Sequence, residues 1–149
     1  MSTKSLKLSI SNNKLAEAFF EDARLLGIMM PEKEYQFCWR INNFLGMQFK
    51  ANPDIEIRLK KKERDYYFSV YQYFEPTGSL SHYIYKNKYD GEYLLPEFKH
   101  LDYLWLMKDD YVSDNELQTK ANFIRHVPGI QLVVELTNEK IKNKEHLIF

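Results

Sequence analysis

The sequence predicts a single α+β domain over residues 1–149, with a mainly antiparallel sheet of about six strands and two main helices packed on it. Short alternations of apolar and polar residues follow one another through short turns, which favours antiparallel pairing. Two longer segments carry apolar residues at helical spacing. The composition, 44% hydrophobic and 28% charged with five glycines and five prolines, is typical of one domain without a long linker.

The first elements are short. Residues 6–10 alternate apolar and polar side chains and predict a strand. Leu15, Ala18 and Phe19 allow one or two helical turns, and residues 25–29 predict a buried strand. The first of the two main helices is expected to follow directly.

This first main helix is predicted from Pro31 to Leu45. Cys38, Ile41 and Leu45 recur at spacings of three and four residues, which places them on one helix face. Proline is favoured in a first helical turn, and Gly46 is a typical residue for a helix end.

A β-hairpin is predicted at residues 54–74, with the charged stretch 60–65 as its connection. Both sides of the hairpin alternate apolar and polar residues. A third strand follows at residues 81–86, and residues 87–92 read as a polar loop.

The last elements have clearer boundaries. Residues 101–107 are apolar on both faces, which is typical of a central strand. Ser113 and Glu116 form a capping box that starts the second main helix. Residues 130–136 alternate again and predict the final strand.

Two carboxylates stand at fixed positions in residues 95–103, Leu-Pro-Glu-Phe-Lys-His-Leu-Asp-Tyr. Pro96 fixes φ and has no N–H, so the chain bends or begins a strand there. Asp102 is expected to be buried and hydrogen-bonded, with Tyr103 pointing to the opposite face. Either Glu97 and Asp102 anchor the turn to the sheet, or they line a pocket. Buried carboxylates serve structure more often than catalysis.

This segment resembles the bacterial IPExxxVDY family, whose motif is Ile-Pro-Glu, three free positions and Val-Asp-Tyr. Pro96, Glu97, Asp102 and Tyr103 match the motif, while leucines replace its isoleucine and valine. The resemblance extends over most of the chain. It implies a small cytoplasmic protein of a family without an assigned activity, so it supplies no catalytic residue or cofactor.

No pattern of catalytic residues is found in the sequence. There is no glycine-rich phosphate loop and no GxSxG motif, and the four histidines lack ligand spacing. A metal site assembled from distant His and acidic residues remains an alternative. The single cysteine, Cys38, excludes an internal disulfide and is expected to be a packed core residue. We therefore expect no catalytic residue, metal or cofactor.

The distribution of charge indicates which classes of partner the protein can bind. Lys+Arg and Asp+Glu are both 21, so no overall field attracts nucleic acid or an anionic membrane. No apolar window reaches membrane-spanning length and the N-terminus lacks a signal-peptide core, which favours a cytoplasmic location. Weak RNA binding through the basic hairpin 58–64 stays as an alternative, because cations beside aromatic rings hold single strands.

Tyrosine is abundant, with eleven residues. Five of them are expected to form one patch on neighbouring strands: Tyr67, Tyr71, Tyr73, Tyr83 and Tyr85. Such a face is either covered by helices or exposed as an interaction site. The leading hypothesis is a non-enzymatic binding or assembly protein, with a protein partner or a homodimer on this face. The alternative is a small-ligand binder or enzyme with a pocket that uses Glu97 and Asp102.

Overall fold

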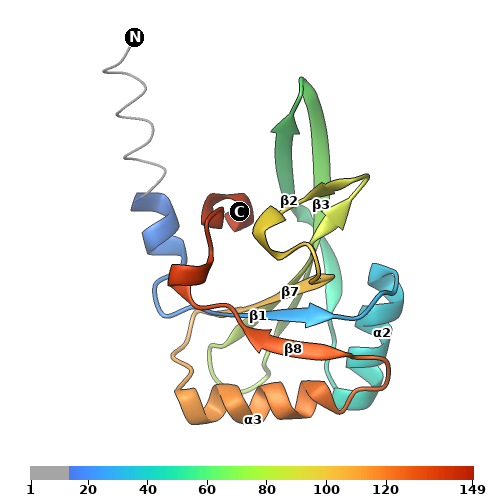
Figure 1. Ribbon diagram of the computed structural model, residues 1–149. Coiled ribbons are helices and arrows are strands. Elements are labelled where there is room, and N and C mark those ends of the chain that lie inside the picture. Colours follow the sequence, from blue (N-terminus) through green and yellow to red (C-terminus); the bar gives the residue numbers. More distant parts are fainter. Residues whose placement is uncertain (1–13) are drawn as a thin grey trace.

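The computed structural model describes residues 14–149, so the strand predicted at residues 6–10 lies outside the described part. Within it the α+β prediction is confirmed, because six strands form one sheet in the order β2-β3-β4-β7-β1-β8 (Figure 1). Every neighbouring pair in this sheet is antiparallel. The strands are β1 (Arg24–Met29), β2 (Lys50–Lys61), β3 (Arg64–Phe74), β4 (Ser81–Lys86), β7 (Tyr103–Lys108) and β8 (Leu132–Glu135).

The two predicted main helices are α2 (Glu34–Leu45) and α3 (Asp114–Arg125). Residues 14–19 form a further short helix. The minor elements are the paired strands β5 (Lys88–Tyr89) and β6 (Glu92–Tyr93) and the 3₁₀ turns η1 (Pro96–Phe98), η2 (Asn138–Lys140) and η3 (Lys144–Leu147). No helix within residues 14–149 has both the length and the apolar character that a membrane crossing requires.

The helix ends follow from local chemistry. Helix α2 starts at Glu34 rather than at Pro31, since Lys33 still has an extended backbone with φ −68° and ψ 152°. It ends at Gly46, whose φ of +66° lies in the left-handed region that glycine adopts without strain. Helix α3 has the predicted cap, because the Glu116 N–H donates to Ser113 Oγ at 3.2 Å.

The β2–β3 hairpin turns over only two residues, Lys62 and Glu63, with φ angles of +53° and +64°. Positive φ at both positions is the geometry of a tight hairpin turn whose twist matches the strands. Most of the predicted connection, residues 60–65, therefore belongs to the strands. The hairpin projects well beyond the rest of the sheet (Figure 1).

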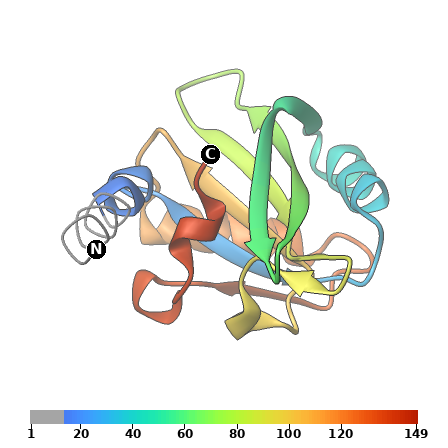
Figure 2. The same ribbon diagram turned by 90° about the horizontal axis from the view of Figure 1, so that it is seen from above.

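Helices α2 and α3 cover one face of the sheet, as predicted (Figures 1 and 2), but this is the face of Tyr71 and Trp105 and not the expected face of Phe68 and Val70. Their apolar stripes pack on Tyr103, Trp105 and Met107 of β7. The buried helix residues are Phe37, Cys38 and Ile41 of α2 and Leu117, Ala121 and Ile124 of α3.

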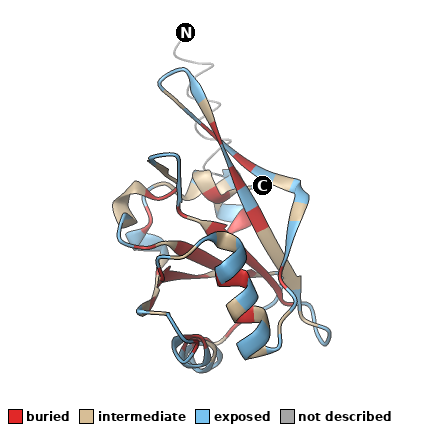
Figure 3. Cartoon of the chain, turned by 90° about the vertical axis from the view of Figure 1, so that its right-hand side faces the viewer, coloured by how far each residue is buried: buried red, intermediate tan, exposed pale blue. Residues whose placement is uncertain are grey.

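Segments without long helices cover the opposite face. Phe20, Leu95 and Leu147 come from three distant parts of the chain and pack with Leu104 and Leu106 of β7. Figure 2 shows the C-terminal segment lying across the sheet on this side. Strand β7 is thus buried on both faces, as predicted for a central strand, and the buried residues concentrate in the sheet (Figure 3).

Candidate functional site

The loop that carries the sequence motif is organised by one fully buried side chain, that of Asn87. Its Nδ2 donates to the carbonyls of Phe98 at 2.9 Å and Leu101 at 3.0 Å. Its Oδ1 accepts from the Leu95 N–H at 2.8 Å. A buried amide whose groups are satisfied in this way fixes the path of the backbone around it.

Sequence reasoning missed this role of Asn87. The asparagine follows β4 directly and reads as a turn residue, because asparagine commonly bonds to nearby backbone in loops. Its backbone is also engaged, since its N–H donates to the Asp102 carbonyl and its carbonyl accepts from Leu94. Asn87 therefore connects both ends of the motif loop to β4.

Glu97 of the motif holds the C-terminal segment. Its Oε2 accepts from the backbone N–H groups of Lys142 at 2.6 Å and Asn143 at 3.0 Å, and its Oε1 accepts from Asn143 Nδ2 at 2.8 Å. Partial burial raises the pKa of Glu97, but these hydrogen bonds outweigh it and the net pKa is lowered. This geometry is that of an anchoring carboxylate.

Asp102 and Tyr103 tie β7 to the end of β1. Asp102 Oδ2 accepts from the Met30 N–H at 2.6 Å, and the Tyr103 hydroxyl donates to the Glu32 carbonyl. The Tyr103 ring stacks on Phe37 with ring centroids 4.0 Å apart. Asp102 is hydrogen-bonded as predicted but only half-buried, because it precedes β7 at the rim of the sheet.

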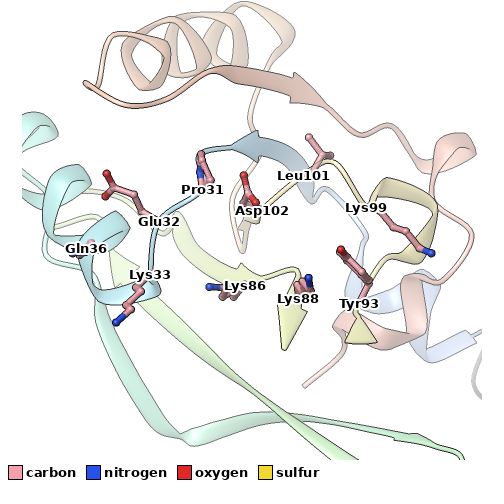
Figure 4. Close-up of a pocket in the computed structure, with 10 residues that line it drawn as sticks. All are labelled: Pro31, Glu32, Lys33, Gln36, Lys86, Lys88, Tyr93, Lys99, Leu101 and Asp102. Atoms are coloured by element: carbon pink, nitrogen blue, oxygen red, sulfur yellow. The ribbon is translucent and has the colours of Figure 1, made fainter. Parts of the chain in front are cut away.

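Asp102 lies in the wall of a pocket of about 580 Å³ (Figure 4), whereas Glu97 lies outside it. The two carboxylates do not share a pocket, so that part of the sequence-based alternative is wrong. The pocket is lined by Pro31, Glu32, Lys33, Gln36, Lys86, Lys88, Tyr93, Lys99, Leu101 and Asp102.

Positive charge dominates this lining. None of its four lysines forms an ion pair within the described residues 14–149. By contrast, Glu32 is neutralised by Arg40, with Arg40 Nη2 at 2.9 Å from Oε1 and Nε at 3.0 Å from Oε2. The Nζ atoms of Lys88 and Lys99 lie 5.6 and 5.8 Å from the Tyr93 ring centroid, within cation–π range.

The N-terminus of α2 adds to this field. Pro31 to Gln36 contribute four lining residues, and Lys33 makes no side-chain cap. The free N–H groups of a first helical turn carry partial positive charge and favour anions. Glu34 in this turn is half-buried, and burial raises its pKa more than nearby Lys86 lowers it.

The five tyrosines do not form one face, so this prediction is wrong. Strands β3 and β4 pair Val70 with Tyr85 and Tyr71 with Ile84, and directly opposite residues share a face. Tyr85 is therefore buried on the side of Val70, where its hydroxyl donates to the Leu147 carbonyl at 2.8 Å. Tyr83 lies on that side too, whereas Tyr71 and Tyr73 pack half-buried beneath the helices and Tyr67 is exposed.

The basic hairpin carries partners of opposite charge. Arg58 pairs with Asp65 at 2.9 Å, Lys61 with Glu92 at 3.5 Å, and Arg64 with Asp90. Acidic residues thus interrupt the positive surface that single-stranded RNA binding requires.

A second, mostly apolar pocket of about 400 Å³ lies between α2 and α3. At its floor, Trp105 Nε1 donates to His82 Nδ1 at 2.9 Å, and His82 Nε2 lies 2.8 Å from Glu75 Oε1. Because an indole N–H only donates, His82 Nδ1 must accept, so the ring is neutral and its Nε2–H donates to Glu75. Burial accordingly lowers the pKa of His82.

Cys38 and a metal site assembled from distant side chains are the remaining candidates from the sequence. Burial raises the pKa of the Cys38 thiol to about 12, which suits a packed core residue. Within residues 14–149, no three His, Cys, Asp or Glu side chains gather in a group that could hold a metal ion.

In comparisons with known proteins, no family model, curated protein or solved structure matches the chain.

Proposed function

We propose that the protein binds a small phosphate-bearing anion in the pocket beside Asp102. The observation that carries this proposal is the charge of the pocket lining. Four lysines without an ion-pair partner among residues 14–149 outnumber two carboxylates, and Arg40 neutralises one of these. A volume of about 580 Å³ lies within the range of pockets that enclose small molecules. The proposal keeps the ligand-binding alternative drawn from the motif, with Asp102 but without Glu97.

The lysines reach the pocket from separate elements. Lys33 precedes α2, Lys86 ends β4, Lys88 lies in β5, and Lys99 follows η1. Lysines that line one pocket from four elements favour an anion with several charged oxygens, because each ammonium can contact a different one. In Figure 4 the ammonium groups of Lys33 and Lys99 point away from the middle of the pocket, so these two side chains must rotate inward to bind an anion together with the other two lysines. The uncapped first turn of α2 supports the same ligand class.

Neutralising two of these lysines is expected to weaken anion binding. The double variant Lys88→Gln/Lys99→Gln should raise the Kd for inorganic pyrophosphate about tenfold, since it removes two of the four cations. Isothermal titration calorimetry at low and physiological salt measures this change. The matched control is Lys60→Gln/Lys62→Gln on the hairpin, which alters net charge equally and should leave the Kd within about twofold. Equal losses in both double variants would contradict a localised site.

A second candidate function is protein association through α2. Tyr35 and Trp39 are four residues apart on this helix, so they share one face, and both are 61% exposed. Tyrosine and tryptophan are enriched among residues that dominate binding energy at protein interfaces. We propose this surface, in place of the five-tyrosine face, for the assembly role and for a homodimer.

Light scattering across a concentration series tests self-association. We expect the average mass to rise with concentration, and the variant Tyr35→Ser/Trp39→Ser to remain monomeric, because it removes two large apolar contacts. Tyr111→Ser, another highly exposed tyrosine, is the control and should associate like the wild type. A wild type that stays monomeric at every concentration would contradict the dimer.

We also propose, from the resemblance of the motif and of most of the chain, that the protein belongs to the IPExxxVDY family and acts in a bacterial cytoplasm. Isolation of the native ligand from a bacterial cytoplasm would test whether the protein acts in that compartment.

A further inference from the structure

We infer that the ligand of this pocket is a phosphate ester that carries hydroxyl groups, as sugar phosphates and nucleotides do, and that Asp102 selects it. This inference rests on the anion-binding function proposed above. It concerns Asp102, the acidic lining residue that no cation among residues 14–149 neutralises and that would otherwise oppose the binding of any anion.

The two carboxylate oxygens of Asp102 have different surroundings. Oδ2 is committed to the Met30 N–H at 2.6 Å, whereas Oδ1 accepts no hydrogen bond from the described residues and is not among their buried unpaired atoms. The Asp102 side chain is half-buried and lines the pocket, and Oδ1 keeps accessible surface there, which we take to face the ligand. One oxygen therefore shapes the fold, and the other is free for a ligand.

The position of Asp102 is held from both sides. Its backbone N–H donates to the Ile28 carbonyl at 2.8 Å, and its own carbonyl accepts from the Asn87 N–H at 2.9 Å. With Met30 fixing the carboxylate as well, the side chain has little freedom to turn away from an approaching anion. A group held before the ligand arrives discriminates better than one that must be ordered on binding.

The pocket thus has two chemically different parts. Figure 4 shows Asp102 on one side of the pocket, beside Pro31 and Leu101, and Lys86 and Lys88 on the other. The lysines suit phosphate oxygens. A carboxylate oxygen only accepts hydrogen bonds and repels phosphate, so the ligand must offer a donor there. The exposed ring of Pro31 provides apolar contact for the carbon skeleton that carries the donor.

The hydroxyl of a sugar is the donor that fits this arrangement. It is neutral, so it bonds to the carboxylate without drawing the phosphate away from the lysines. A ligand that covers the Asp102 carboxylate without offering a donor removes its water and leaves Oδ1 unpaired, so the site disfavours an analogue that lacks the hydroxyl. The expected discrimination is therefore against simple phosphates.

The probes are ribose 5-phosphate and methyl phosphate, which share a phosphate monoester but differ in hydroxyl groups. Isothermal titration calorimetry on the wild type should give a Kd about tenfold lower for ribose 5-phosphate. In Asp102→Asn the amide oxygen can still accept from Met30, while the amide NH₂ presents a donor to the pocket. This variant should bind methyl phosphate at least as tightly as the wild type and lose most of the preference for ribose 5-phosphate.

The control is Asp54→Asn, an exposed aspartate on β2, which should keep the wild-type preference. Equal wild-type affinity for the two probes would overturn the role of Asp102 while leaving anion binding intact, and this result needs no variant to fold. An unchanged preference in a folded Asp102→Asn would overturn it as well. If neither probe binds the wild type at millimolar concentration, the anion-binding function itself fails, and the inference fails with it.

Discussion

Replacing Asn87 by alanine is expected to lower the free energy of unfolding by about 4 kcal/mol. The change leaves the Leu95 N–H and the carbonyls of Phe98 and Leu101 without their partner inside the protein. Each buried group left unsatisfied costs about 1–3 kcal/mol. Urea denaturation followed by circular dichroism measures the loss.

Two further variants, Asn115→Ala and Asn87→Asp, serve as the control and as a second test of this prediction. Asn115→Ala, at an exposed position of α3, should change stability by no more than about 0.5 kcal/mol. Asn87→Asp keeps an acceptor for Leu95 but points a carboxylate at two carbonyls, so it should be destabilised as strongly at neutral pH. A loss below about 1 kcal/mol in Asn87→Ala would show that the loop does not depend on this side chain.

Replacing His82 by alanine is expected to cost about 3 kcal/mol at pH 8. The change removes the acceptor of the buried Trp105 indole N–H and the donor to Glu75, and it leaves a cavity at the centre of the sheet. His100→Ala, at an exposed position, is the control and should be nearly neutral. Chemical denaturation of the three proteins side by side gives the comparison.

His82 also makes stability depend on pH. Burial lowers its pKa from the ordinary 6.5, so the folded state favours the neutral form of His82 more than the unfolded chain does. As the pH falls below about 6.5, the unfolded chain binds a proton that folded His82 does not, and stability declines until the folded pKa is reached. The wild type should therefore lose stability between pH 7 and pH 5, and His82→Ala should lose less over this interval.

Glu75 extends the decline to lower pH. Burial raises the pKa of Glu75, but its hydrogen bonds to His82 and Lys120 outweigh this, so the net pKa lies below the ordinary 4.5. Its contribution to stability is present above pH 4.5 and is lost as the pH falls through the folded pKa.

A wild-type stability that rises on acidification from pH 7 to pH 5 would contradict a neutral, proton-resistant His82.

Much of the fold could be predicted from periodicity. The alternation of apolar and polar residues predicts most of the strands. The capping box at Ser113 predicts α3, and residues 101–107, which are apolar on both faces, predict the central strand β7. The pairing of β3 with β4 could not be read in this way, because a slip of one residue moves every side chain to the other face. Tyr83 and Tyr85 were therefore assigned to the wrong side.

The candidate site was predictable only in part. The motif drew attention to Asp102, which does line the pocket. It also suggested Glu97, but the η1 turn directs that side chain to Asn143 instead. The four lysines are scattered from position 33 to position 99 and have no spacing that a local pattern reveals. Only the fold brings them together.

The position of β1 in the sheet has a consequence for how the chain folds. Leu26 of this strand pairs with Trp105 on one side and with Glu135 on the other. Such pairings close long loops, whose entropy must be offset before the contacts form, and they slow folding. The β2–β3 and β3–β4 pairs join strands that are consecutive in the chain, whereas β1 is synthesised early and pairs only with the later strands β7 and β8. Strand β1 therefore does not have both neighbours until residue 135 has been synthesised, and its apolar side chains are exposed to aggregation and to chaperones during that interval.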